Sequence, residues 1–420
     1  MYKEDKLSAN VSAPLPDREG QGESPFDEII ERRGTGCVKW DQTPAANGQK
    51  LKANSQNIIP LWVADMDFAI APAIQEAIRK RAEHPVFGYT HVQDDYYEAV
   101  ISWFKRRHQW SIQREWILYT IGVVPAMSVA IKALTMPGEK VLILSPDYNC
   151  FFSSIRNNGC EVAECVLRFS RSNNRFEIDW QDFEQQCADE KTTIFLLCNP
   201  HNPTGRVWSR EELQGMVDIC KKHGVRIVSD EIHCELIMPG YTFVPMGTVD
   251  ADAIILNSPS KSFNIAGLMM ANIICQDAAT RRRLDRAINI NEVCDVNSFA
   301  PEAVKAAYND SEDWIDALNQ YLWDNYRALC DFVAQHLPQW KVMPLEGTYL
   351  VWVDVSAALA ESDDSVATYC DKILEETKVW LNPGTMYGPQ SGEGYLRINI
   401  ACPRSLLMEA LERINNYNKK

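Results

Sequence analysis

The sequence predicts an α/β protein with a large, mostly parallel sheet and a smaller α+β region. Short apolar runs recur in the middle of the chain, and most of them precede a loop and a stretch with helical periodicity. The runs are continuously apolar, which is typical of strands that are covered by helices on both faces. A length of 420 residues is enough for two domains. We therefore expect strand–helix units around a parallel sheet, followed by a second region of different organisation.

The first elements follow a leader that we expect to be disordered. Residues 1–25 are dominated by Ser, Pro, Gly and charged residues and contain no apolar core, so they resemble neither a folded segment nor a secretory signal. Short strand signals occur within 26–68. Helical patterns then cover 71–83, 94–108 and 124–135, and the strands of the sheet are expected at 141–145, 193–198, 225–230, 253–258 and 271–275. A helix at 209–223 begins with a capping box formed by Ser209 and Glu212.

The second half of the chain lacks a long series of parallel strands. Residues 276–337 are mainly helical, and Pro338 ends that stretch. A strand at 349–355, a helix at 364–378, a strand at 395–401 and a helix at 403–417 follow. We expect a large α/β domain at 76–314 and a small α+β domain made of 26–75 and 315–420.

Composition excludes several classes of function. The formal net charge is −15, so the surface as a whole is unsuited to phosphate-dominated binding of nucleic acid. No segment approaches the ~20 apolar residues of a membrane span. The 13 cysteines form no CxxC pair, and several lie inside apolar runs. They indicate free thiols in a reducing cytoplasm and offer no spacing for a metal site.

Chemically useful side chains follow four successive strands. Tyr148 follows the first strand, Asn202 lies in the loop NPHNPTG after the second, and Asp230 ends the third. The fourth strand is followed by SPSK, which contains Ser258, Ser260 and Lys261. Because ligands of open parallel sheets bind beyond the carboxyl ends of the strands, we expect these residues to converge.

This combination matches the requirements of pyridoxal phosphate. A lysine can form a Schiff base with an aldehyde, and a carboxylate can pair with a pyridinium nitrogen. An aromatic ring can stack on the pyridine, and an amide can hold its phenolic oxygen. The segment Gly122-Val123-Val124-Pro125 opens a helix whose free N–H groups can face a phosphate. Taken singly, such a lysine is usually solvated and such an aspartate is often a cap, so the argument depends on their joint occurrence. Nucleotide-binding glycine motifs are absent from the sequence.

Longer motifs resemble fold-type I pyridoxal-phosphate enzymes of the aminotransferase class I/II superfamily, in particular the MalY/PatB-type cystathionine β-lyases, or C–S lyases. The resemblance runs from about residue 26 to 417. It is carried by VKWD (38–41), PLWVADMDF (60–68), HPVFGYT (84–90), GVVPA (122–126), SPDYNCF (145–151), NPHNPTGRVW (199–208), SDEIH (229–233), SPSKSFNIAGL (258–268), LNPGTMYG (381–388) and GYLRINIACPRS (394–405). It implies a seven-stranded-type, mostly parallel sheet with a smaller α+β domain.

The resemblance also implies roles for individual residues. Lys261 matches the Schiff-base lysine, Asp230 the partner of the pyridinium, and Tyr148 the stacking ring. Asn202 matches the donor to the phenolic oxygen. The phosphate-binding positions correspond to Gly122, Val123 and Ser258, and Val124 and Ser260 are further candidates for cofactor binding. Arg397 matches the arginine that binds the substrate α-carboxylate, with Asn202 and Trp62 also at substrate-binding positions. Tyr89 matches a tyrosine that reaches the phosphate of the neighbouring subunit, which implies a homodimer.

Three departures from related patterns concern the pocket. His233 stands where aminotransferases often have tyrosine, as is usual in the lyase subgroup, and it is either a cofactor contact or a core histidine. Met269 stands where many aminotransferases place a phosphate-binding arginine. The stretch YTFVPMGTV (241–249) lacks the histidines that the lyase subgroup often has there.

The function that this resemblance implies is α,β-elimination on cystathionine or a related S-substituted L-cysteine, which yields a thiol, pyruvate and ammonia. An amino-acid aminotransferase with the same machinery is the first alternative. A regulatory binding protein that retains the cofactor is the second. The residues do not identify the thioether, a regulatory partner or a role for residues 1–25.

Overall fold

A computed structural model describes residues 24–42, 44–46, 49–50, 57–362 and 364–419, so the predicted leader lies outside the described residues except for Ser24 and Pro25. The largest sheet has seven strands in the order β4-β12-β11-β10-β9-β5-β6. Its strands are β4 (Ile117–Thr120), β5 (Lys140–Ser145), β6 (Glu161–Val166), β9 (Thr192–Cys198), β10 (Arg226–Asp230), β11 (Ile254–Asn257) and β12 (Ala271–Ile274). Six strands share one direction, and β12 is antiparallel to both of its neighbours. This confirms the predicted fold class.

The antiparallel direction of β12 follows from the short segment before it. Residues 258–270 form turns and one short 3₁₀ helix, Ala266–Leu268. A parallel return usually needs an α-helix that crosses one face of the sheet, and residues 258–270 contain none, so this segment instead turns the chain back beside β11. Lys261 lies in this turning segment and is thereby held at the carboxyl end of β11.

Helices cover both faces of the large sheet, which explains why its strands are continuously apolar. Val141 and Ile143 of β5 pack on one side with α4, α5 and α8, while Leu142 and Leu144 pack on the other side with α3 and α7. The helices around this sheet are α2 (Pro72–Glu83), α3 (Asp94–His108), α4 (Val123–Leu134), α5 (Asn149–Asn157), α6 (Trp180–Cys187), α7 (Arg210–His223), α8 (Ala278–Ile290) and α9 (Ala300–Asp310). The expected capping box is present at the start of α7, where Ser209 and Glu212 bond reciprocally.

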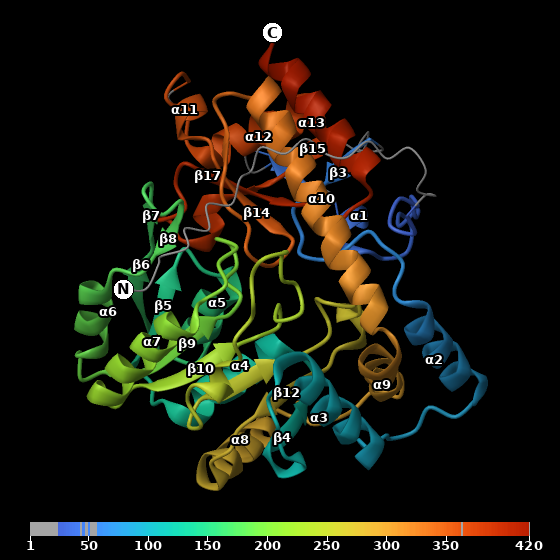
Figure 1. Ribbon diagram of the computed structural model, residues 1–420, viewed down its shortest axis with the longest axis vertical. Coiled ribbons are helices and arrows are strands. Elements are labelled where there is room, and N and C mark those ends of the chain that lie inside the picture. Colours follow the sequence, from blue (N-terminus) through green and yellow to red (C-terminus); the bar gives the residue numbers. More distant parts are fainter. Residues whose placement is uncertain (1–23, 43, 47–48, 51–56, 363, 420) are drawn as a thin grey trace, which may run out of the picture.

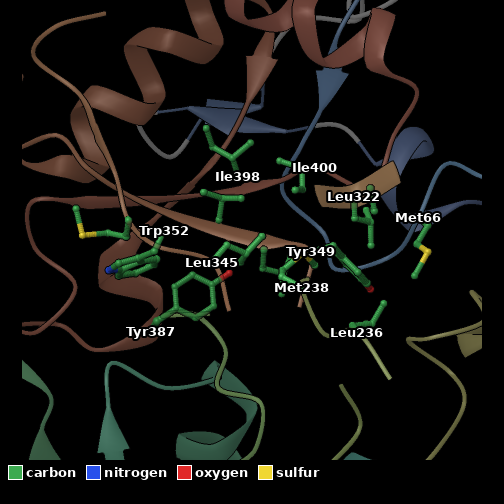
Figure 2. Close-up of a cluster of buried hydrophobic side chains, with 14 of the residues drawn as sticks. Met66, Leu236, Met238, Leu322, Leu345, Tyr349, Trp352, Tyr387, Ile398 and Ile400 are labelled. Atoms are coloured by element: carbon green, nitrogen blue, oxygen red, sulfur yellow. The ribbon is translucent and has the colours of Figure 1, made fainter. Parts of the chain in front are cut away.

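The C-terminal part forms a second, smaller sheet. Its antiparallel order is β13-β14-β17-β16, built from β13 (Lys341–Val342), β14 (Leu350–Asp354), β16 (Asn382–Pro383) and β17 (Tyr395–Asn399). Its helices are α10 (Glu312–His336), α11 (Ser356–Leu359), α12 (Val366–Thr377) and α13 (Arg404–Asn418). In Figure 1 these elements occupy the upper part and the large sheet the lower part. Figure 2 shows the buried cluster of this region, which includes Tyr349, Trp352, Ile398 and Ile400.

The N-terminal segment joins this smaller unit. Strand β3 (Ile59–Pro60) pairs in parallel with β15 (Val379–Trp380), and helix α1 (Val38–Asp41) precedes it. Figure 1 shows these N-terminal elements beside the C-terminal helices. The pairing supports the inclusion of 26–75 with the C-terminal region, although the exact domain bounds stay a prediction. Within the described part of the chain, none of the helices has the length and apolar character that crossing a membrane requires.

Several short elements were not anticipated from the sequence. They are β4, β6, α5, α6, the β7–β8 hairpin (Arg168–Ser170 with Arg175–Glu177), the β1–β2 pair (Ala45–Ala46 with Gln49–Lys50), α1, β13, α11, β15 and β16. The edge strand β6 illustrates the reason, because its exposed Glu161 and Glu164 interrupt the apolar run around the buried Ala163 and Cys165. Brief segments of this kind carry little periodic signal.

Candidate active site

The carboxyl ends of four adjacent strands open into one cavity of about 190 Å³. The order β11-β10-β9-β5 brings together the loops that contain Lys261, Asp230, Asn202 and Tyr148. The full lining is Ala64, Ile121, Gly122, Val123, Val124, Pro125, Tyr148, Cys198, Asn202, Asp230, Ile232, His233, Ser260, Lys261, Ala266, Met269 and Met270. The structure thus brings the main predicted residues to a single site.

The first turn of α4 forms the wall suited to an anion. Gly122 is the N-cap at a φ of 155°, a backbone conformation that side-chain-bearing residues rarely adopt. The backbone N–H groups at the start of a helix lack partners within the helix, and the helix dipole adds positive potential there. Gly122, Val123, Val124 and Ser260 all line the cavity. This wall fits a phosphate group.

Ser258 lies behind that wall. Its hydroxyl donates to the carbonyl oxygen of Met270 at 2.6 Å and lies 2.6 Å from the Ser260 hydroxyl. The backbone N–H of Ser260 also donates to the Ser258 oxygen at 3.1 Å. Ser258 is not among the residues that line the cavity, whereas Ser260 is. In this arrangement Ser258 shapes the turn that presents Ser260 and Lys261.

Asp230 is a buried carboxylate at the base of the cavity, with 4% of its surface exposed. The backbone N–H of Ile232 donates to its Oδ1 at 3.1 Å. Burial nevertheless raises the pKa of Asp230 to about 7, with Asp147 adding to the rise and Lys261 opposing it. A carboxylate in this setting favours a cationic partner, and a pyridinium N–H is such a partner.

Lys261 faces the same cavity from the turn after β11. Its Nζ donates to the carbonyl oxygen of Ala64 at 2.7 Å, and the Tyr349 hydroxyl donates to that same oxygen at 2.9 Å. Burial lowers the pKa of the Lys261 amine, and Arg397 adds to this, whereas Asp65 and Asp230 oppose it. A lysine with a lowered pKa is more readily an unprotonated amine, which is the form that attacks a carbonyl or accepts a proton.

Arg397 lies on β17, is 3% exposed and is not among the residues that line the cavity. Its Nη1 donates to Asn202 Oδ1 at 3.1 Å and its Nη2 donates to the carbonyl oxygen of Trp62 at 2.7 Å. Its guanidinium lies 4.5 Å from the centre of the Tyr387 ring, a cation–π contact. Its Nε is buried without a partner among the described residues. The guanidinium is thus oriented and retains a donor for an incoming carboxylate.

Asn202 and Trp62, which were both predicted to contact the substrate, accept hydrogen bonds from Arg397. The Asn202 oxygen is engaged by Arg397, so its amide nitrogen is the group that can donate toward a phenolic oxygen in the cavity. Trp62 contributes its backbone carbonyl to Arg397, while its indole ring stacks on Trp380 with the ring centres 4.2 Å apart. The Trp62 ring is not among the residues that line the cavity.

His233 and Tyr148 complete the apolar and aromatic part of the cavity. Burial lowers the pKa of His233 to about 3, helped by the charges of Lys261 and Arg397, so the ring is neutral. Its Nδ1 has no partner among the described residues, and the ring packs edge-on against Tyr349. Its place in the lining favours a contact with a bound group over a purely core role. Burial raises the pKa of the Tyr148 hydroxyl well above its usual value.

Tyr89 is the one predicted site residue that lies fully on the surface, with a relative exposure of 102%. It does not line the cavity of its own chain. Its loop is tied to the segment before α9, because Thr90 pairs with Val296 and its hydroxyl contacts that of Ser298 at 3.0 Å. Asn297 in turn bonds the carbonyl of Leu268, next to the exposed Met269 at the cavity.

Sequence reasoning missed the contributions of Ala64, Asp65, Tyr349 and Tyr387. Ala64 and Asp65 lie in the motif WVADMDF, and Tyr387 lies in LNPGTMYG, so the motifs marked the right segments without indicating the roles. Tyr349 precedes an apolar strand and resembles an ordinary core aromatic. Backbone carbonyls such as that of Ala64 carry no signal in residue type, and their use is visible only in three dimensions.

A separate cluster of possible metal ligands is better explained as a buried ion pair. Ligand atoms of His108, Cys234 and Glu235 lie within 4.8 Å of one another. Glu235 already accepts a hydrogen bond from Trp103 Nε1 at 2.7 Å, lies 2.7 Å from His108 Nε2 and has Arg107 at 3.7 Å. These donors satisfy the carboxylate without a metal ion.

Comparisons with known proteins agree with this geometry. Residues 56–414 match the family described as aminotransferase class I and II. Cystathionine beta-lyase PatB from Bacillus subtilis (strain 168) is 38% identical over 93% of this chain and 98% of its own. Cystalysin from Treponema denticola, whose crystal structure contains pyridoxal 5′-phosphate, is 36% identical over 94% of this chain and 98% of its own, with a TM-score of 0.87. A PLP-bound putative aminotransferase from Clostridium difficile 630 is 37% identical over 93% and 98% of the two chains, with a TM-score of 0.86.

Proposed function

The chain belongs to the class I and II aminotransferase family, and on that basis we propose that it is a pyridoxal-phosphate-dependent C–S β-lyase. Its proposed reaction is the α,β-elimination of cystathionine or a related S-substituted L-cysteine. The observation that supports this most directly is that Lys261, Asp230 and Asn202 line one cavity and that Arg397 is hydrogen-bonded to Asn202. Relatives named as lyases favour elimination among the reactions that such a site can catalyse.

The residues present fit pyridoxal phosphate. The α4 turn with Ser260 would hold the phosphate, the Asp230 carboxylate would pair with the ring nitrogen, and Tyr148 would stack on the ring. Lys261 would provide the amine that links to the aldehyde. When bound, pyridoxal phosphate serves as an electron sink for the electron pair that remains after Cα of the substrate loses its proton.

The chain's own residues then account for substrate binding and proton movement. Arg397 binds the α-carboxylate, and its contacts with Asn202 and Trp62 fix the direction of the guanidinium. This fixes the orientation of the Cα–H bond relative to Lys261, which is a positioning effect. Lys261 Nζ accepts the Cα proton, because burial favours its unprotonated form. Asp230 stays ionised once a cation lies beside it and keeps the ring nitrogen protonated.

Loss of the sulfur group and uptake of water complete the reaction. The Cβ–S bond breaks, its electron pair leaves with sulfur, and a proton converts the thiolate to the thiol. The remaining three-carbon unit takes up water and yields pyruvate and ammonia. Overall, one thioether and one water give one thiol, one pyruvate and one ammonium ion, without an oxidant or reductant.

Product analysis with and without a keto acid tests the proposal. Purified enzyme loaded with pyridoxal phosphate should release pyruvate and a thiol from cystathionine or an S-alkyl-L-cysteine when no keto acid is supplied. Formation of product only in the presence of a keto acid would instead establish the aminotransferase alternative. The same generic residues serve both reactions, so this measurement decides between them.

We also infer a homodimer in the cytoplasm. Tyr89 projects from the surface beside the exposed apolar residues Val86 and Phe87, and Val124 and Met269 are exposed at the cavity. Such a surface suits contact with a second copy whose cavity Tyr89 could reach. All 13 cysteines are free thiols, which supports a reducing compartment.

A further inference from the structure

The backbone carbonyls of residues 62–65, the loop that contains Ala64, accept hydrogen bonds from several side chains. Trp62 accepts from Arg397 at 2.7 Å and from Asn382 at 3.0 Å. Ala64 accepts from Lys261 at 2.7 Å and from Tyr349 at 2.9 Å, as described above. Asn399 donates to the carbonyls of Val63 and Asp65 at 2.6 and 2.7 Å. The position of this loop therefore fixes what surrounds the Lys261 amine.

Two cationic side chains of the N-terminal segment, Arg32 and Lys39, also form hydrogen bonds with this loop. Arg32 Nη2 donates to Asp65 Oδ2 at 2.7 Å, and Arg32 Nη1 donates to Asp67 Oδ1 at 2.6 Å and to the Met66 carbonyl at 2.9 Å. Lys39, whose side chain is fully buried, donates to Asp67 Oδ2 at 2.7 Å and to the Asp65 carbonyl at 3.2 Å. Met66 itself is anchored in the cluster drawn in Figure 2.

The Arg32–Asp65 ion pair is only partly exposed to solvent. The Asp65 side chain is 23% exposed and the Arg32 side chain is 21% exposed, so the pair is partly shielded from water. Asp65 directly follows Ala64, whose backbone carbonyl accepts the hydrogen bond from the Lys261 amine. It is also the charged group that most strongly favours protonation of the Lys261 amine, ahead of Asp230.

The other charged or titratable groups that face Lys261 come from several elements. They are Asp230 at the end of β10, His233 in the following turn, Cys150 on α5 and Arg397 on β17. Arg397 and Asp230 are assigned to the substrate and the cofactor in the proposed function. Asp65 is bound instead by Arg32 at 2.7 Å and by Lys39, whose Nζ lies 3.6 Å from Asp65 Oδ1, and neither cation lines the cavity.

We propose that Arg32 and Asp65 are a positioning pair for Lys261. Arg32 holds the Asp65 carboxylate and the adjoining Ala64 carbonyl in place beside the amine and offsets part of the carboxylate's charge. The pair thereby sets how readily the amine gains and loses a proton, and its role in turnover rests on the proposed function. Both residues act through Lys261 and are not catalytic residues themselves.

The proposal requires that replacing Asp65 and replacing Arg32 shift the pKa of the Lys261 amine in opposite directions. Removing the negative charge with Asp65→Asn should lower the pH at which Lys261 is half protonated by about 0.5 to 1 unit. Removing the positive charge with Arg32→Gln should raise that pH by a smaller amount, because Asp65 loses the nearer of its two cations and keeps Lys39 at 3.6 Å. In the double variant the effect of Arg32→Gln should largely disappear, since its target charge is gone. Arg33→Gln is the matched control, because Arg33 pairs with the exposed Glu31 and lies over Trp40.

Two measurements on the full-length chain test this. The first is the pH dependence of carbamylation of Lys261 by cyanate without cofactor, followed by peptide mass spectrometry. It needs neither cofactor nor substrate, so it holds even if the enzyme proves to be an aminotransferase. The second is the pH profile of kcat with cofactor and an S-alkyl-L-cysteine, whose acidic limb should move in the same direction in each variant.

Several outcomes would overturn the proposal. If Asp65→Asn and Arg32→Gln have the same midpoint pH of Lys261 carbamylation as Arg33→Gln, the pair has no influence on Lys261. Shifts in the same direction for Asp65→Asn and Arg32→Gln would show a general loosening of the loop. If circular dichroism shows that Arg32→Gln is unfolded, Arg32→Lys replaces it: the lysine keeps the charge, so the midpoint should stay within about 0.3 unit of wild type. A larger shift in that variant would contradict the charge-offset role.

Discussion

Replacing Asp230 by asparagine keeps the size of the side chain and removes its charge. In the proposed enzyme the buried carboxylate is the partner of the ring nitrogen, and it is 4% exposed. Removing one partner of a buried charged pair costs about 3–5 kcal/mol. Because about 1.36 kcal/mol in barrier height corresponds to a factor of ten, we expect turnover of an S-alkyl-L-cysteine to fall about 10²- to 10⁴-fold. Pyruvate release measures turnover, and visible absorbance should show that the cofactor still binds.

The same substitution should change how stability depends on pH in the cofactor-free chain. The folded chain keeps the Asp230 proton up to a pKa of about 7, whereas the ordinary value is 3.8. Between these values the unfolded state binds fewer protons, so the free energy of unfolding falls as the pH rises. From pH 5 to pH 8 the loss is about 3 kcal/mol, because the difference in bound protons lasts for about two pH units, up to the folded-state pKa, at about 1.36 kcal/mol each. Asp230→Asn lacks this titration, so its stability relative to wild type should increase by about 3 kcal/mol between pH 5 and pH 8 in urea unfolding.

Glu231 provides the matched control for both measurements. It is fully buried beside Asp230, accepts hydrogen bonds from Met246 N and Ser229 Oγ, and does not line the cavity. Burial raises the pKa of Glu231 to about 8, so Glu231→Gln should show a similar pH-dependent gain in stability. Its turnover should stay within about threefold of wild type, because the glutamine resembles the protonated acid.

Two results would refute this reasoning. Unchanged turnover in Asp230→Asn would show that Asp230 does not hold the ring nitrogen. Equal losses of turnover in Asp230→Asn and Glu231→Gln would show that the strand end is damaged in general and that the cavity-facing carboxylate has no special role. Added pyridoxal phosphate should stabilise wild type more than Asp230→Asn at pH 8, since only wild type supplies the opposite charge.

The remaining predictions concern Lys261, Arg397 and the subunit interface. Borohydride reduction of the loaded enzyme should attach the cofactor to Lys261, and Lys261→Ala should lose both this link and turnover; recovery of the label on another lysine would contradict the assignment. Arg397→Lys should raise KM for the thioether by about 10-fold or more, because a bidentate, charge-assisted contact is lost; steady-state kinetics measure it, and an unchanged KM would place the carboxylate elsewhere. A mixed dimer of Tyr89→Phe and Lys261→Ala subunits should keep about half of wild-type activity if Tyr89 serves the neighbouring cavity, since one site then carries both lesions. Low activity of that mixed dimer, or a monomer in sedimentation experiments, would contradict the predicted arrangement.

Much of the fold could be predicted from the sequence because its strands and helices have strong local patterns. The predicted helix at 94–108 coincides with α3, and the capping box at Ser209 starts α7 as expected. Four strand ends were expected to deliver Tyr148, Asn202, Asp230 and Lys261 to one place, and they line one cavity. The geometric rule for parallel sheets makes this step possible, since the carboxyl ends of neighbouring strands share one edge.

Tertiary structure alone decided the contacts that depend on distant backbone atoms. The Ala64 carbonyl meets Lys261 across 197 positions of sequence, and Arg397 meets Asn202 across 195. Ser258 and Ser260 are equivalent as residue types, but only the packed turn determines that Ser260 lines the cavity and Ser258 supports it. Likewise, the antiparallel direction of β12 and the ion pair between Arg32 and Asp65 depend on how the folded chain brings these segments together. Local sequence determines which groups are available, whereas the energy of a buried charge or hydrogen bond depends on partners that only folding brings within reach.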